Sequence, residues 1–421
     1  MYLPKIKIVT FGCASNQADS NIMKNILSSV ALVGDFDFSQ AEYVIVNSCS
    51  VKGPTENKVI DFIKTIPLPK YAIIICGCLV SDKKKKKEFK DYSLVSPYNV
   101  TRIGEVINFL EKNKKPIHLL GSEKNNKLAN ISAVNGIAII PILIGCLGAC
   151  TYCKTKQAKP RFFSYPQKEI IKTISRLIKK GCHEIWLSSE DNGAYGVDFK
   201  SNYLGLLKEI EKKFKDKNVM FRFGMANPEH IYKYLKETKT FFENTNCFYK
   251  FLHIPIQSAN DSVLKKMNRK YNNKKIEKIS SELNGIVTLS TDIICGFPTE
   301  TEKQFDESYI FIKKHKPLIV NVSQFWVRPF TKAQEMKQLS SEIKKTRSTK
   351  LSSLQKGIIK SGLSSYLGKT IEVYVDEYKT PFFWGRTRNY ILVKINSKKP
   401  LSLGKWKKFK VKGIESNHLV V

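Results

Sequence analysis

The sequence predicts an α/β protein in three parts: an N-terminal parallel α/β domain, a central open and partial (β/α)6 barrel, and a small C-terminal antiparallel β-barrel. Three observations support this prediction. The 421 residues exceed the length of one ordinary domain. Short apolar runs alternate with helical patterns through most of the chain, and near the C-terminus the pattern changes to strands separated by turns.

The first predicted domain covers residues 1–118. Its apolar runs KIKIVTF, AEYVIVN and YAIIIC alternate with helical patterns such as SNIMKNILSSV and TRIGEVINFLEKN. This alternation is typical of a parallel sheet with helices on its faces. The polar stretch GSEKNNKLANISAVN follows and is predicted to be a linker.

The second predicted domain covers residues 134–345 and contains six β-α units. Its strand candidates are GIAIIPILI, HEIWLSS, VMFRFGM, YKFLHIPIQ, IVTLSTDIIC and LIVNVSQFW. In the helical pattern after the first strand, apolar residues recur at positions 170, 171, 174, 177 and 178, and Ser164 is the expected N-cap. Six such units predict an open, partial barrel with its chemistry at the C-terminal ends of the strands.

The third predicted domain, residues 363–421, is a small antiparallel barrel of OB-like size, built from GKTIEVYVDEY, FFWGRTRNYILVKI and KKFKVKGI. Basic residues lie among aromatic ones, a mixture that suits single-stranded or looped RNA. The predicted RNA-binding residues are Trp384, Arg386, Arg388, Lys405, Lys407 and Lys408. The alternative is an ordinary β-barrel whose aromatic residues, such as Phe382, Phe383, Tyr390 and Trp406, form its core.

The net charge indicates a polyanionic partner. Lys and Arg number 71 against 37 Asp and Glu, a formal charge of +34, and nucleic acid is the commonest polyanion. A general bias toward lysine in the composition is the alternative. The run from Lys83 to Lys87 is either part of this basic surface or a solvated charged loop.

The apolar segments are too short for a membrane span. The longest, GIAIIPILIG, is broken by Pro141, whereas a spanning helix needs about 18 or more apolar residues. The N-terminus reads as a first strand, without the basic and apolar regions of a signal peptide. We therefore expect a cytoplasmic protein with no membrane partner, in which the ten cysteines are ligands or buried thiols.

The loop GCLGACTYCK offers three closely spaced thiols, Cys146, Cys150 and Cys153. A structural zinc site normally takes four protein ligands. A cubane iron–sulfur cluster held by three thiolates leaves one iron open, and that iron can bind a substrate. The loop follows the first strand of a six-unit β-α array, and this context favours the cluster over zinc.

A second set of three cysteines, Cys13, Cys49 and Cys78, occupies one repeated position at the end of an apolar strand. In a parallel sheet these strand ends gather at one edge, so the three thiols are expected to hold a second cluster. A buried inert thiol is the alternative for any one of them. Cys76 faces the same side of the strand as Cys78. Cys78 is preferred because it follows a glycine at the strand exit, where Cys13 also stands, and the alternative is that Cys76 takes its place. The remaining cysteines, Cys182, Cys247 and Cys295, are interpreted as core residues.

The spacing CxxxCxxC with Tyr152 before the last cysteine resembles the radical SAM enzymes, and the whole chain resembles their methylthiotransferase family. The motifs that carry this resemblance are TFGCASNQADS, VNSCSV, CGCL, GCLGACTYCK, SSEDNGAYG, RFGMANPEHI, HIPIQSANDSVLKKMNRKY, TDIICGFPTETEKQF and SQFWVRPFTKA. The resemblance implies two [4Fe-4S] clusters and S-adenosyl-L-methionine (SAM), with the C-terminal barrel as a TRAM-like RNA-binding domain. It implies that the first cluster carries or delivers sulfur and that the second generates a 5′-deoxyadenosyl radical. The electron donor and the sulfur source are not identified.

The resemblance also implies three groups of SAM-binding residues at strand ends. Those near the methionine part of SAM are Ser189, Glu190 and Asp191. Those near the adenosine are Ile256, Gln257, Ser258 and Gly296. Those facing SAM or the target base are Gln324, Arg328 and Pro329. The alternative for each polar residue is that it satisfies backbone groups at the end of its strand.

Among branches of the family, CKTKQAK and SSEDNGAYG look most like the archaeal and eukaryotic-type enzymes. Those methylthiolate threonylcarbamoyladenosine beside the tRNA anticodon, so tRNA is the expected partner. Two departures concern the branch: Leu147, Gly148 and Ala149 precede Cys150 where Asn is usual, and KPR replaces an Arg-Gly pair after Ala158. The alternatives are isopentenyladenosine in tRNA, an aspartate of a ribosomal protein, and an iron–sulfur RNA-binding protein without catalysis. The positive charge favours RNA.

Overall fold

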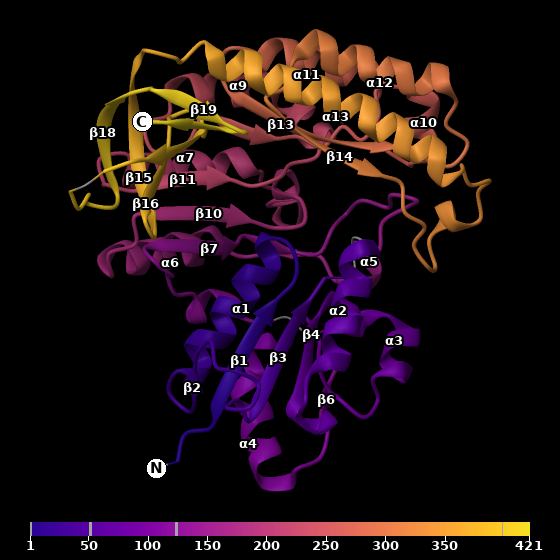
Figure 1. Cartoon of the computed structure of the whole chain (residues 1–421), viewed down its shortest axis with the longest axis vertical. Helices are drawn as coiled ribbons and strands as arrows, with labels where there is room; N and C mark the ends of the chain where they lie inside the picture. The colour runs from indigo at the N-terminus through magenta and orange to yellow at the C-terminus, as the bar shows by residue number, and fades with distance from the viewer. Residues whose placement is uncertain (1, 50–52, 123–124, 398) are drawn as a thin grey trace.

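The computed structural model describes residues 2–49, 53–122, 125–397 and 399–421. It confirms the predicted α/β class. Figure 1 shows the N-terminal sheet in the lower half of the view, the central β/α array above it, and the C-terminal sheet at the upper left. Among the described residues, no helix is long and apolar enough to cross a membrane.

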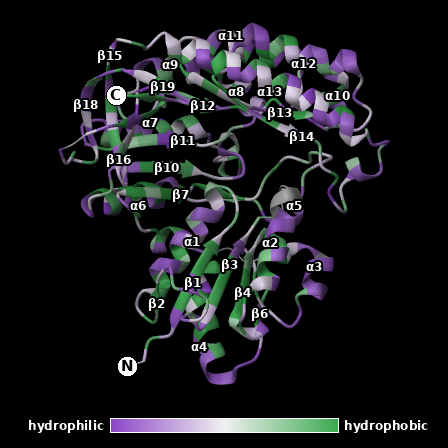
Figure 2. Cartoon of the chain, in the orientation of Figure 1, coloured by the Kyte–Doolittle hydropathy of each residue, from purple (hydrophilic) through white to green (hydrophobic). Residues whose placement is uncertain are grey.

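The N-terminal sheet has six parallel strands in the order β2-β1-β3-β4-β5-β6. The strands are β1 (Lys5–Thr10), β2 (Leu32–Val33), β3 (Tyr43–Ser48), β4 (Ile73–Gly77), β5 (Ser93–Val95) and β6 (His118–Leu119). The helices are α1 (Ala14–Leu27), α2 (Gly53–Thr65), α3 (Lys83–Glu88) and α4 (Ile103–Asn113). Figure 2 shows the apolar strands between more polar helices.

Alternation along β3 builds an apolar core on each face of this sheet. Tyr43 and Ile45 pack with residues of α1 and α4, whereas Val44 and Val46 pack with residues of α2. Because successive side chains of a strand point to opposite faces, a continuous apolar run is what a sheet covered on both sides requires. All three predicted strands of this part are present as β1, β3 and β4.

The central array has six parallel strands that follow one another in sequence order. They are β7 (Ile137–Pro141), β10 (Glu184–Ser188), β11 (Met220–Phe223), β12 (Phe251–His253), β13 (Thr288–Cys295) and β14 (Ile319–Gln324). The ladder is interrupted between β11 and β12, where a single bridge joins Phe221 to Phe248. The helices between the strands are α6 (Gln167–Lys179), α7 (Tyr203–Phe214), α8 (Pro228–Lys233), α9 (Leu235–Asn244), α10 (Asp261–Lys266), α11 (Asn273–Leu283) and α12 (Glu302–His315).

The expected N-cap of α6 is wrong. Ser164 belongs to β9 (Phe163–Ser164), which pairs with β8 (Leu143–Ile144), and its hydroxyl accepts a hydrogen bond from Gly196 N at 3.0 Å. Pro166 precedes the helix instead. The amphipathic pattern itself is confirmed, since Ile170, Ile174 and Leu177 are buried in the core.

The C-terminal sheet has the order β18-β15-β16-β17-β20-β19. Its strands are β15 (Thr370–Lys379), β16 (Phe382–Arg386), β17 (Leu392–Ile395), β18 (Lys405–Lys410), β19 (Gly413–Glu415) and β20 (His418–Val420). The expectation of a purely antiparallel arrangement is wrong in one place, because β17 and β20 pair in parallel. Strands β19 and β20 form a short antiparallel hairpin, and after it β20 runs in the same direction as β17.

Two further segments differ from a loose loop. The lysine run from Lys83 begins helix α3, whose N-terminus is capped by the Asp82 side chain, so the charged-loop alternative is wrong. In the expected linker, Lys127 and Leu128 are buried, and that stretch packs against the rest of the molecule. Helix α13 (Ser341–Ser364) links the central array to the C-terminal sheet and lies along the top of Figure 1.

Candidate functional site

The first cysteine trio lies at the ends of three neighbouring strands. Cys13 follows β1, Cys49 follows β3 and Cys78 follows β4, and these strands are adjacent in the sheet. Cys13 is exposed, while Cys49 and Cys78 are buried. Cys13 and Cys49 both act electrostatically on Cys78, so the topology brings these three thiols to one edge of the sheet.

Tight backbone turns bring the thiols of this trio close together. Gly77 has φ +90°, and a Cβ there would lie 2.3 Å from Ser48 O. Gly12 has φ +144°, and its Cβ would lie 2.9 Å from the Cβ of Cys49. Only glycine permits such conformations and such a close approach. The backbone at Gly12 and Gly77 can therefore approach the end of β3 closely, just before Cys13 and Cys78.

A pair of buried asparagines fixes the backbone beneath this trio. Asn47 donates to Asn16 O at 2.8 Å, and Asn16 donates to Ser48 O at 3.1 Å. Asn16 also accepts a hydrogen bond from the Cys13 thiol at 3.5 Å. Sequence reasoning quoted the motifs that contain both asparagines but gave them no role.

Cys76 and Cys78 have different surroundings. Cys76 has an exposed fraction of 0% and packs in the apolar core with Ile74 and Val95. Cys78 lies past Gly77 at the strand exit, where Cys13 and Cys49 also lie. This arrangement favours Cys78 over Cys76 as the third ligand.

The second trio occupies one loop after β8. A hydrogen-bond donor approaches each sulfur: Gly148 N lies 3.3 Å from Cys146 Sγ, Thr155 N lies 3.4 Å from Cys153 Sγ, and Arg269 Nη1 lies 3.1 Å from Cys150 Sγ. Such donors stabilise thiolates and tune the potential of a bound cluster. Arg269 stands in the motif HIPIQSANDSVLKKMNRKY, but sequence reasoning did not assign it.

The donor sets fit clusters better than single metal ions. Among the described residues, the only group of three His, Cys, Asp or Glu ligand atoms within 4.8 Å of one another is Asp191, Glu229 and His230. In a cubane each thiolate binds its own iron, so the sulfurs need not converge on one point. Burial raises the pKa of both Cys78 and Cys146 to about 12, and a bound metal would replace those thiol protons.

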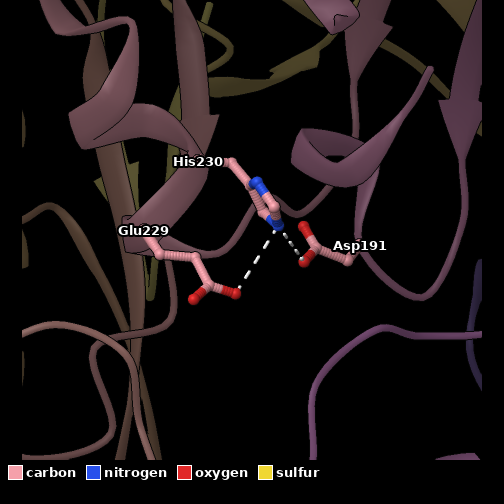
Figure 3. Close-up of side chains that lie close together, drawn as sticks. All are labelled: Asp191, Glu229 and His230. Atoms are coloured by element: carbon pink, nitrogen blue, oxygen red, sulfur yellow. Dashed lines mark ion pairs between the residues drawn. The ribbon is translucent and has the colours of Figure 1, made fainter. Parts of the chain in front are cut away.

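Asp191, from the segment after β10, is a buried carboxylate held from several sides. It accepts hydrogen bonds from Asn227 N at 3.0 Å and from Asn227 Nδ2 at 2.5 Å. Figure 3 shows Asp191 and Glu229 converging on His230, whose Nε2 lies 3.4 Å and 3.5 Å from their oxygens. Burial lowers the pKa of His230, but the two carboxylates outweigh it and raise that pKa above its usual value. Asp191 also acts on Cys146, so this group borders the second trio.

Glu190 connects the two trios through a buried ion pair. Its Oε2 accepts a hydrogen bond from Gly145 N, next to Cys146, at 3.0 Å. Its other oxygen pairs with Lys159, whose ammonium group also donates to Ser15 at 2.9 Å. Burial alone would lower the pKa of Lys159, but Glu190 and Cys78 outweigh it and raise that pKa. Glu190 was predicted to lie near SAM, whereas Lys159 was noted only as part of a departure from the family pattern.

Arg328 lies just after β14, the last strand of the array, and contacts helix α2 of the N-terminal part. It is 4% exposed, and its Nη1 lies 3.3 Å from Glu56 of α2. Gln324, from the end of β14, instead donates to Ser348 of α13 at 3.0 Å. The two residues therefore contact different elements, and for both of them contact with SAM or the target base stays a prediction.

The remaining predicted SAM residues lie after β10, β12 and β13. Ile256 and Ser258 are buried, and Gln257 has φ +67°, an unusual conformation for a residue other than glycine. Gly296 has φ +75° and donates to Glu300 at 2.8 Å. Ser189 bonds to Asn192 of its own turn. These hydrogen bonds satisfy local groups, and SAM contact stays a prediction for each residue.

The predicted RNA-binding residues divide into two sets. Arg386 pairs with Asp376 at 3.4 Å, and Arg388 bonds to Asn246 O of the central array. Arg388 thus helps to hold the C-terminal sheet against that array, whereas the ion pair of Arg386 joins β16 to β15 within the sheet. Lys405 and Lys408 are exposed, whereas Trp384 and Lys407 are partly buried. The exposed lysines are the better candidates for phosphate contact.

Comparisons with known proteins agree with this geometry. The Radical SAM superfamily model matches residues 140–312, and the model of Uncharacterized protein family UPF0004 matches residues 5–95. The radical S-adenosylmethionine methyltransferase TsrM of Kitasatospora setae has a similar fold, with TM-score 0.55, 12% identity, and coverage of 79% of this chain and 77% of that one. The fold and the three-cysteine loop define a radical SAM enzyme.

Two relatives identify the family. A "Threonylcarbamoyladenosine tRNA methylthiotransferase" of Danio rerio is 34% identical over 365 residues, covering 84% of this chain and 66% of the relative. A "Probable threonylcarbamoyladenosine tRNA methylthiotransferase" of Archaeoglobus fulgidus is 33% identical over 430 residues, covering 99% of this chain and 98% of the relative. The chain belongs to the family of threonylcarbamoyladenosine tRNA methylthiotransferases.

Proposed function

We propose that this enzyme methylthiolates N6-threonylcarbamoyladenosine at C2 of the adenine, at position 37 of tRNA, and that it binds the anticodon stem-loop. One observation carries the proposal: one three-cysteine site lies at the edge of the N-terminal sheet, the other lies in the loop after β8, and the two are linked through Lys159 and Glu190. Each site offers three thiols, which leaves one iron of a bound cluster free for a substrate. Membership of the family indicates which nucleoside is the substrate.

The protein and its cofactors have separate tasks in this proposal. Reductive cleavage of SAM supplies a radical able to attack a C–H bond that has no acidity. The chain's own residues hold the thiolates, orient the neighbouring carboxylates and exclude water. Arg269 binds both Cys150 Sγ and Asn227 Oδ1, and Asn227 in turn holds Asp191. This hydrogen-bonded chain fixes the second trio relative to the strand ends.

Nucleoside mass spectrometry tests the proposal. Full-length protein, reconstituted anaerobically and reduced, is incubated with SAM, a sulfide source and tRNA that carries threonylcarbamoyladenosine. We expect the 2-methylthio derivative of that nucleoside. The Cys146→Ala variant should form neither this product nor 5′-deoxyadenosine.

Three other outcomes would point away from this function. Product from isopentenyladenosine alone would reassign the nucleoside. Methylthiolation of a ribosomal protein with none on tRNA would reassign the substrate class. The absence of 5′-deoxyadenosine under verified reduction would leave an RNA-binding protein without catalysis. The cytoplasmic location and the three domain boundaries stay predictions.

A further inference from the structure

A buried arginine between the two trios has unpaired hydrogen-bond donors. Arg328 pairs with Glu56 through Nη1, but its buried Nε and Nη2 have no hydrogen-bond partner among the described residues. The Oε2 of Glu56 likewise makes no hydrogen bond, although it lies 3.3 Å from Nη1. An unsatisfied buried polar group costs about 1–3 kcal/mol. The two free donors of Arg328 can therefore bind a ligand that supplies acceptors.

The charges around Arg328 come from both trios. Burial lowers the pKa of Arg328, while Glu56, Cys49 and Cys153 oppose that shift. Cys49 belongs to the first trio and Cys153 to the second, so the guanidinium group lies near one cysteine of each. Lys159 brings a second buried positive charge beside Cys78. The region between the trios is thus buried and holds two positive charges, each of which is paired with a carboxylate, Glu56 or Glu190.

We propose that Arg328 binds a small sulfur anion, hydrosulfide or an alkylthiolate, between the two cysteine trios and positions it for transfer. This proposal rests on the proposed function, because methylthio transfer requires sulfur as a co-substrate. A guanidinium group is permanently charged, weakly hydrated and carries its donors in a fixed fork. Two charge-assisted hydrogen bonds from Nε and Nη2 would satisfy both donors.

A purely structural ion pair and an anion site predict opposite effects of removing Glu56. If Arg328 only neutralises Glu56, then removing either partner leaves an unpaired buried charge and harms the protein in the same way. If Arg328 binds an anion, Glu56 competes for the guanidinium group and repels the ligand. Removing Glu56 should then strengthen binding, whereas removing Arg328 weakens it.

Equilibrium dialysis measures this binding directly. Full-length protein with both clusters reconstituted is dialysed anaerobically against radiolabelled hydrosulfide, and in a separate arm against radiolabelled methanethiolate. The ligand that binds more tightly shows whether the sulfur enters as hydrosulfide or as methanethiolate. We expect Arg328→Gln to weaken binding about tenfold because it removes charged hydrogen bonds to the anion. We expect Glu56→Gln to tighten binding. Arg328→Lys should fall between wild type and Arg328→Gln because it keeps the charge without the fork.

The variants are compared at equal iron content and at a temperature at which each of them is folded. Unchanged affinity in Arg328→Gln, or weaker binding in both Arg328→Gln and Glu56→Gln, would overturn the proposal. If Arg328→Gln fails to assemble its clusters, the opposite signs expected for Arg328→Lys and Glu56→Gln still decide it. The dialysis contains neither tRNA nor SAM, so its result is separable from that of the nucleoside assay.

Discussion

At the scale of single residues, Cys76 and Cys78 show how a backbone turn can place two nearby thiols in different surroundings. The two cysteines are two positions apart, and an uninterrupted strand would point them to the same face. The strand ends at Gly77, whose φ of +90° redirects the chain. Cys76 stays in the apolar core, and Cys78 joins Cys13 and Cys49 at the sheet edge.

Matched alanine variants test this assignment. Reconstituted wild-type protein should hold about eight irons, the content of two four-iron clusters. Cys78→Ala should lose about four of them because it removes a ligand of the first cluster. Cys76→Ala should keep the wild-type iron content, with a small loss of stability from its core cavity.

Iron analysis and absorbance spectra measure the outcome. The closely placed Cys76→Ala variant serves as the control for general disturbance of β4. Loss of iron in Cys76→Ala together with retention in Cys78→Ala would reverse the assignment.

At the scale of elements, α13 is the part that sequence reasoning left unassigned between residues 345 and 363. The structure has one helix of 24 residues, capped by Ser340. Only a narrow set of its side chains is apolar and buried, including Leu351, Ile358 and Leu363. Because the rest of the helix is polar, its periodicity is weak in the sequence. Packing against the central array stabilises it.

Two glycines within α13 provide a test of its helical state. Gly357 is exposed, and a Cβ there would contact nothing within 4 Å. Gly357→Ala should therefore raise the stability by about 0.5–1 kcal/mol, the helix propensity difference. Gly362→Ala should gain less, because its Cβ would lie 2.9 Å from Leu318 Cδ1.

Thermal unfolding of the two variants beside wild type measures this difference. A loss of stability in Gly357→Ala, or a larger gain in Gly362→Ala, would contradict the helix assignment at these positions.

A buried carboxyl between α12 and α13 makes stability depend on pH. Burial raises the pKa of Glu300 from 4.5 to about 7, although Arg347 Nη1 lies 2.8 Å from it. Between these values the folded state binds a proton that the unfolded state has released, so stability falls as pH rises through this window. Glu300→Gln should remove that contribution and lessen the loss of stability between pH 4.5 and 7.

Denaturant titrations of wild type and Glu300→Gln at several pH values measure the effect. Subtracting the two curves cancels the other titrating groups. Parallel curves across the window would show that Glu300 titrates near its ordinary pKa in the folded protein.

At the scale of the whole molecule, buried ion pairs hold the N-terminal sheet against the central array. Lys154 pairs with Asp82 at 2.6 Å, and Arg328 pairs with Glu56 at 3.3 Å. Lys127 of the expected linker pairs with Asp19, and all of these side chains are at least nine-tenths buried. Breaking such a pair costs about 3–5 kcal/mol, so the pairs favour a single docked arrangement of the two cysteine sites.

The net charge of +34 leads to a prediction about RNA binding. The affinity for an anticodon stem-loop should fall steeply with salt because each phosphate contact releases counterions. The double variant Lys405→Gln/Lys408→Gln should reduce the slope of log K against log salt by about 1.4, from two contacts at about 0.7 each. Binding isotherms at several salt concentrations measure the slope.

An equal charge change on another surface is the control. Lys112 and Lys115 are exposed at the C-terminal end of α4 and just beyond it, far from the C-terminal sheet in Figure 1. The Lys112→Gln/Lys115→Gln variant should leave the slope unchanged. Equal effects of the two double variants would indicate general attraction and no defined contact by the C-terminal sheet.

The sequence by itself determined the α/β class, the radical SAM chemistry and the family, because short-range features encode them. Strand periodicity, the spacing from Cys146 to Cys153 and the recurrent cysteine at strand ends are all local. Only the tertiary structure decided the burial of Cys76 in the apolar core, the parallel pairing of β20, and the contacts of Lys159, Arg269 and Arg328. These depend on burial and on partners distant in sequence, and a local pattern specifies neither of them.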